Sequence, residues 1–96
     1  MPTRNLLLII ADDWSPYAGC YGDDWIQTPH IDRFAESATR FNRGFCSSPS
    51  CAVSRASILT GQHVHTHGQY GHCHGREGFS THKDVRSLPA HLREAG

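Results

Sequence analysis

The chain has near its start an uninterrupted apolar run, LLLIIA at residues 6–11, which ends abruptly at two adjacent acids, Asp12 and Asp13. A run without polar alternation predicts a strand with both faces buried, as in the centre of a parallel sheet. Such a strand needs neighbouring strands at both edges and helices over both faces, so this run constrains the fold more than any other feature. Ligands of parallel sheets bind beyond the carboxyl ends of the strands, where the two acids stand.

The first predicted helix follows a loop over residues 14–27. Thr28 is its expected N-cap and Pro29 its first residue. Proline suits this position, because an N–H group in the first turn of a helix has no acceptor within the helix and its loss therefore costs nothing. Apolar residues then recur at the spacing of one helix face; they are Ile31, Phe34, Ala35 and Ala38.

The remaining pattern alternates between strand and helix. Residues 41–45 predict a short strand, and residues 52–60 predict a helix that ends at Gly61. Residues 62–82 are rich in glycine and histidine and are expected to form a loop, and a last helix is expected to begin at Ser87. This order predicts an α/β fold with a mostly parallel central sheet flanked by helices. Because one strong and one weak strand make an incomplete sheet, we expect residues 1–96 to be the N-terminal portion of a larger domain.

Composition excludes several classes of partner. The formal net charge is +0 at pH 7, so no basic excess points to nucleic acid. No apolar run approaches the roughly 18–20 residues that span a bilayer, so no membrane partner is expected. The start lacks a small-residue cleavage site and is typical of a first strand rather than a signal peptide, which favours a cytoplasmic location. The cysteines show no CxxC pair and no disulfide framework; they are Cys20, Cys46, Cys51 and Cys73.

Asp12 and Asp13 are the first candidate site. Adjacent carboxylates repel each other unless positive charge lies beside them. Ca²⁺ or Mg²⁺ suits them, because these hard cations prefer oxygen ligands. The alternative is a loop start in which one aspartate caps the following turn.

Cys51 is the second candidate. It stands at the opening of the predicted 52–60 helix, where free N–H groups and the helix dipole favour a thiolate or a bound oxyanion. Arg55 is one turn further on the same side, and its planar fork suits a tetrahedral oxyanion. The alternative is a small buried cysteine beside a surface arginine.

Histidines gather in the predicted 62–82 loop. They could bind a transition metal together with a cysteine, although the glycines argue against the strand that would align them. The alternative is a set of solvent-exposed loop histidines. The residues are His63, His65, His67, His72, His74 and Cys73.

Two segments together resemble the N-terminal signatures of the sulfatase family, which belongs to the alkaline-phosphatase-like superfamily. They are LLLIIADD and CAVSRASILTG, the second matching a pattern of Cys or Ser, any residue, Pro or Ala, a small residue, Arg, two variable residues, two apolar residues and Thr-Gly. Val53 departs from that pattern, which has proline or alanine there. TPHIDRFAESATRF resembles the family's first helix, and DVRSLPAHLREAG with QYG at 69–71 resembles the N-sulfoglucosamine sulfohydrolase (heparan N-sulfatase) group.

The resemblance implies an alkaline-phosphatase-like fold and hydrolysis of sulfate esters or sulfamates, on a sulfated small molecule or saccharide. It implies that Asp12, Asp13 and Cys51 bind a metal, usually Ca²⁺ with Mg²⁺ possible. Cys51 would be oxidised to formylglycine (3-oxoalanine) by a formylglycine-generating enzyme. The hydrated aldehyde would carry two hydroxyl groups on one carbon. One hydroxyl would attack sulfur, and deprotonation of the other would then expel sulfate. Arg55 would hold the attacking hydroxyl and neutralise its charge. The other ligands would lie beyond Gly96, so the isolated chain is expected to be inactive.

Two other functions stay open at this point. A phosphatase or phosphonate hydrolase of the same superfamily would keep the metal and the anion site at the helix start. A non-enzymatic metal-binding module would use the loop histidines instead, and would predict Zn²⁺ or Ni²⁺ binding that depends on His63, His65 and His67.

Overall fold

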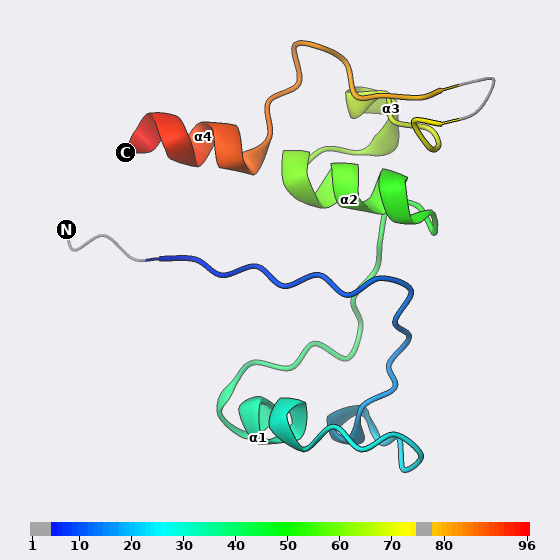
Figure 1. The fold of residues 1–96 in the computed structure, drawn as a ribbon, viewed down its shortest axis with the longest axis vertical. Coiled ribbons are helices and arrows are strands. Elements are labelled where there is room, and N and C mark those ends of the chain that lie inside the picture. Colours follow the sequence, from blue (N-terminus) through cyan, green and yellow to red (C-terminus); the bar gives the residue numbers. More distant parts are fainter. Residues whose placement is uncertain (1–4, 75–77) are drawn as a thin grey trace. The chain divides into compact units, whose positions relative to one another are not determined.

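The computed structural model describes residues 5–74 and 78–96, and the chain divides into two compact units, Met1–Arg43 and Gly44–Gly96. Figure 1 shows short helices joined by long irregular segments. Each unit is described by itself. No helix in the described part of the chain is long and apolar enough to cross a membrane.

The first unit is built around the short 3-10 helix η1 (Gly19–Tyr21) and the helix α1 (Pro29–Ser37). The predicted start of α1 is confirmed, with Thr28 as N-cap and a proline in the first turn. The carboxylate of Asp32 in α1 accepts hydrogen bonds from the Cys20 N–H at 2.7 Å and from the Thr28 hydroxyl at 3.1 Å. Thr28 Oγ1 in turn accepts the Gly19 N–H at 3.0 Å. The side chains of Asp32 in α1 and of the N-cap residue Thr28 therefore hold η1 in place.

The predicted α/β fold with a mostly parallel sheet is wrong for the described residues, which form helices and no strand. Residues 5–11 run extended and residues 41–45 are irregular (Figure 1). A strand exists only when a neighbour takes up its N–H and C=O groups, and neither segment pairs with another. The apolar run is accordingly exposed rather than buried, with Leu7 82% and Ile9 81% accessible.

The second unit contains α2 (Cys51–Thr60), α3 (Val64–His67) and α4 (Leu88–Ala95), and α2 contacts both of the others. The predicted 52–60 helix is confirmed as α2. Gly61 ends it in the left-handed conformation at φ 67°, with its N–H on the Ser57 carbonyl at 2.8 Å. The last predicted helix is confirmed as α4, with Ser87 as N-cap.

The short helix α3 lies inside the segment predicted to be a loop, so that prediction is wrong for residues 64–67. It is a single turn without apolar periodicity, and Gly68 closes it at φ 79°. The buried residues nearby are mostly polar, because His67 is 0% and Gln69 5% exposed while Val53 is the buried apolar side chain of α2. The second unit is therefore organised around hydrogen bonds as much as apolar packing.

Candidate active site

Cys51 is the first residue of α2, and its side chain is an exposed free thiol. Ser50 before it is extended, and the first hydrogen bond within the helix runs from Ser54 N–H to Ser50 carbonyl at 2.8 Å. The N–H groups of residues 51–53 thus have no acceptor within the helix, as at every helix start. Together with the helix dipole they favour negative charge beside Cys51.

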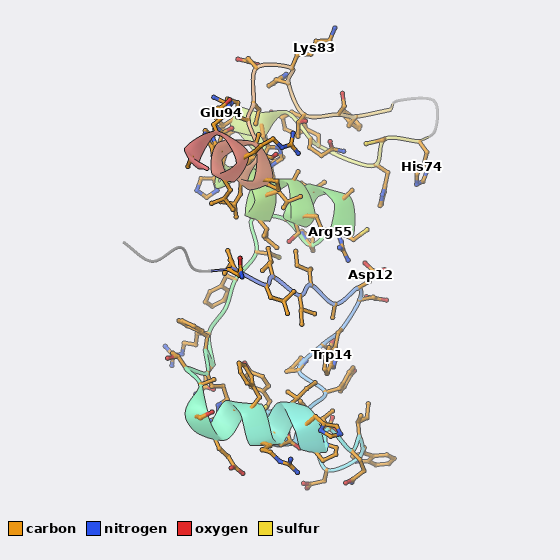
Figure 2. The ribbon with its side chains drawn as sticks, turned by 60° about the vertical axis from the view of Figure 1, so that its left-hand side comes forward. Asp12, Trp14, Arg55, His74, Lys83 and Glu94 are labelled. Carbon is orange, nitrogen blue, oxygen red and sulfur yellow. The ribbon has the colours of Figure 1, made fainter. Side chains whose placement is uncertain are left out.

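Arg55 lies one turn further along α2 and is half-buried (Figure 2). Residues four apart on a helix are neighbours on its surface, so the structure brings Cys51 and Arg55 to the same side of α2. A guanidinium beside an anion-favouring helix start adds a fixed positive charge with several donors.

An open cavity of about 700 Å³ lies beside α2. Its lining includes Ser54 and Ile58, which stand three and seven positions after Cys51, spacings that share one helix face. Ser57 also lines it. The lining does not include Cys51 or Arg55, so the cavity lies along the middle and end of α2.

Asp12 and Asp13 lie in the first unit, directly after the extended segment, and Asp12 stands where that segment turns (Figure 2). Both are exposed, and Asp13 has a left-handed backbone at φ 50°. Aspartate tolerates this conformation better than most residues, although it is uncommon. Two carboxylates offer oxygen donors that fit a hard divalent cation, although Ca²⁺ takes 6–8 oxygens in all.

The metal-ligand predictions divide between the units, Asp12 and Asp13 in the first and Cys51 in the second. In residues 5–74 and 78–96, no three histidine, cysteine, aspartate or glutamate side chains converge as a metal site requires.

The predicted histidine cluster divides into two stacked pairs. The rings of His63 and His65 lie 5.9 Å apart and nearly parallel, and those of His72 and His74 lie 5.1 Å apart. In each stacked pair the faces of the two imidazole rings, and not their nitrogen lone pairs, point toward each other.

The sequence pattern places His67 among the loop histidines, but the structure gives it a different place. Its Nε2 lies 2.9 Å from Ser57 Oγ, and its Nδ1 accepts the Gln69 N–H at 3.0 Å. Burial lowers the pKa of His67, and the neighbouring His82 and His65 lower it further. No local pattern in the sequence marks the Ser57–His67 contact, because it joins side chains ten residues apart.

Comparison with known proteins identifies the class. A family profile described as Sulfatase matches residues 4–96, and the chain therefore belongs to the sulfatase family. Human N-sulphoglucosamine sulphohydrolase is 43% identical over 93 residues, covering 97% of this chain and 18% of the relative. Human iduronate 2-sulfatase is 45% identical over 62 residues, covering 65% of this chain and 11% of the relative.

A bacterial relative has a similar span. The ulvan-active sulfatase of Formosa agariphila is 30% identical over 93 residues, covering 96% of this chain and 18% of the relative. The chain thus spans less than a fifth of the length of these curated relatives.

Proposed function

We propose that this chain carries the nucleophile of an enzyme that hydrolyses sulfate esters or sulfamates on a sugar. One observation carries the proposal. In a chain of the sulfatase family, Cys51 is the exposed first residue of α2, and Arg55 follows one turn further along the same helix. The names of the relatives support the substrate class, since they include a sulphohydrolase of N-sulphoglucosamine and an iduronate sulfatase. Residues 1–96 would act as part of a larger catalytic domain.

In this proposal Cys51 acts after oxidation of its CH₂–SH group to an aldehyde by a formylglycine-generating enzyme. The hydrated aldehyde would supply a hydroxyl for attack on sulfur. The N–H groups of residues 51–53 would stabilise the charge that develops on the oxygens at sulfur, because they are fixed in place before the reaction. Arg55 would hold the nucleophile and neutralise part of the same charge.

Asp12, Asp13 and modified Cys51 would hold a divalent cation, Ca²⁺ or Mg²⁺. When bound, the cation would supply positive charge that lowers the pKa of a hydroxyl and draws electrons from the sulfate group. The adjacent exposed carboxylates support this assignment, because carboxylate oxygens are the donors that a hard divalent cation prefers.

Turnover by the full-length protein that contains this chain tests the proposal. The protein is produced with a formylglycine-generating enzyme and assayed on an aryl sulfate, a glucosamine N-sulfate and an aryl phosphate. We expect turnover of a sulfate ester or the sulfamate that exceeds that of the phosphate ester. Cys51→Ala is expected to abolish turnover, while the control Cys46→Ala, in the same segment, keeps it.

A protein that prefers the phosphate ester would be a phosphatase of the same superfamily, and the proposed function would be wrong. The same conclusion follows if Cys51→Ala retains turnover.

A further inference from the structure

A chain of hydrogen bonds crosses the second unit next to the helix that carries Cys51 and Arg55. His67 is 0% exposed, and its Nε2 lies 2.9 Å from Ser57 Oγ in α2. Ser57 Oγ also accepts a hydrogen bond from the Ser47 hydroxyl at 2.6 Å. His67 therefore links α3 to the middle of α2.

The other ring nitrogen of His67 fixes the tautomer. The Gln69 backbone N–H donates to Nδ1 at 3.0 Å, and a backbone amide can only donate, so Nδ1 carries the lone pair. The proton of the neutral ring is then on Nε2, which donates to Ser57 Oγ. Both ring nitrogens are thus in use while His67 is neutral. A second proton would have to go on Nδ1, where it would oppose the Gln69 N–H.

The ring and its backbone are anchored to the chain that returns after residue 78. The His67 carbonyl accepts the His82 N–H at 2.9 Å. The Gln69 side chain, which is also buried, donates from Nε2 to the Phe79 carbonyl at 3.0 Å and to the Gly71 carbonyl at 2.5 Å. The bond to Ser57 therefore connects α2 to a segment that is itself held from several sides.

Among the residues that the structure describes, the ionisable groups that act on the pKa of His67 are two histidines. His65 is on α3, and His82 comes from the returning segment. The His82 ring packs against Gly68, because a Cβ atom added at Gly68 would lie 2.5 Å from the Nε2 atom of His82. Burial, followed by His82 and His65, lowers the pKa of His67 below its usual value of about 6.5. A lowered pKa means that the folded state favours neutral His67. This contribution to stability is present above about pH 6.5 and is lost as the pH falls toward the lowered value.

We propose that His67 is a positioning residue, whose neutral ring holds α2 through Ser57 and thereby fixes Cys51 and Arg55 in their working orientation. The proposal rests on the proposed function and adds a residue that acts through a helix rather than by touching the substrate. Protonation of His67 breaks the bond from Gln69 and loosens the frame to which α2 is attached. Activity is therefore lost on the acid side because the helix moves, in addition to any titration of the reacting groups.

The test is the dependence of kcat on pH in the full-length protein, with three variants. His67→Gln keeps a donor that can reach Ser57 but does not titrate. His67→Ala removes the donor, and His65→Gln is the matched control on the same helix. We expect the acid-side loss of kcat to be at least several-fold smaller in His67→Gln than in the wild type. We expect His67→Ala to lose at least tenfold in kcat at neutral pH, since a 1 Å misplacement of a catalytic group can cost about 10²-fold. We expect His65→Gln to match the wild type at neutral pH, with its acid limb at the same or slightly higher pH because His65 helps to lower the pKa of His67.

An acid limb in His67→Gln identical to that of the wild type overturns the proposal, as does full kcat in His67→Ala. If His67→Gln does not fold, Ser57→Ala takes its place, because it removes the acceptor and keeps the histidine. A several-fold lower kcat in Ser57→Ala supports the positioning role, and an unchanged kcat and pH profile contradicts it.

Nitrogen-15 NMR of the histidine rings separates this proposal from the proposed function. Wild-type His67 is expected to be neutral at pH 6.5, with its proton on Nε2, and a proton on Nδ1 overturns the positioning role whatever the kinetics. Absence of turnover in the wild type at every pH, with the Nε2–H form present, contradicts the proposed function instead.

Discussion

At the scale of single residues, Val53 shows how packing explains a departure from the family pattern. It stands two positions after Cys51, where the pattern has proline or alanine, and it is 1% exposed. Valine is a poorer helix former than alanine, but its two methyl groups fill space that alanine would leave empty. We infer that stability of the second unit is the reason for a valine at this place.

Replacing Val53 by alanine is expected to lower the free energy of unfolding of the full-length protein by about 2 kcal/mol, through lost burial and the cavity left behind. The matched control is Ile58→Ala on the same helix, where 47% of the side chain is exposed and the loss should be clearly smaller. Denaturant unfolding measures both. Equal losses in the two variants would show that Val53 contributes no special packing.

At the scale of elements, the helices were predictable because their ends are marked locally. Residue types typical of helix ends stand at these boundaries, and the structure places the ends there, although neither N-cap side chain makes a capping hydrogen bond; the residues are Thr28 with Pro29, Gly61 and Ser87. The two predicted strands are not formed in the described residues, because strand formation depends on a partner segment that the local sequence does not specify. The α3 helix was missed because one turn is too short to show periodicity.

Gly61 provides the test at this scale. It adopts φ 67° and nothing lies within 4 Å of where its Cβ would be, so an alanine there meets only backbone strain. Gly61→Ala is expected to lower the free energy of unfolding by about 1 kcal/mol or somewhat more. The control is Gly44→Ala, which has equal space and no positive φ, and is expected to be neutral or slightly stabilising. Thermal unfolding compares them, and equal stability of the two variants would contradict the role of Gly61 as a cap.

At the scale of the whole molecule, the sequence predicted the family and the candidate residues but not how they are supported. The motif from Cys51 to Gly61 marks one helix, and Asp12 and Asp13 mark the end of one apolar run. The support from His67 depends on a contact across a turn of the chain, which no spacing in the sequence encodes.

The central claim is that Cys51 is converted to formylglycine, and peptide mass spectrometry of the full-length protein tests it most directly. Trypsin cleaves after Arg43 and Arg55, and the peptide between them holds Cys51 together with Cys46 as an internal control. Exchange of sulfur and two hydrogens for one oxygen lowers the peptide mass by about 18 Da. After thiol alkylation we predict that Cys46 carries the alkyl group while Cys51 has the aldehyde mass. Alkylation of both cysteines in protein from its native host would contradict the account.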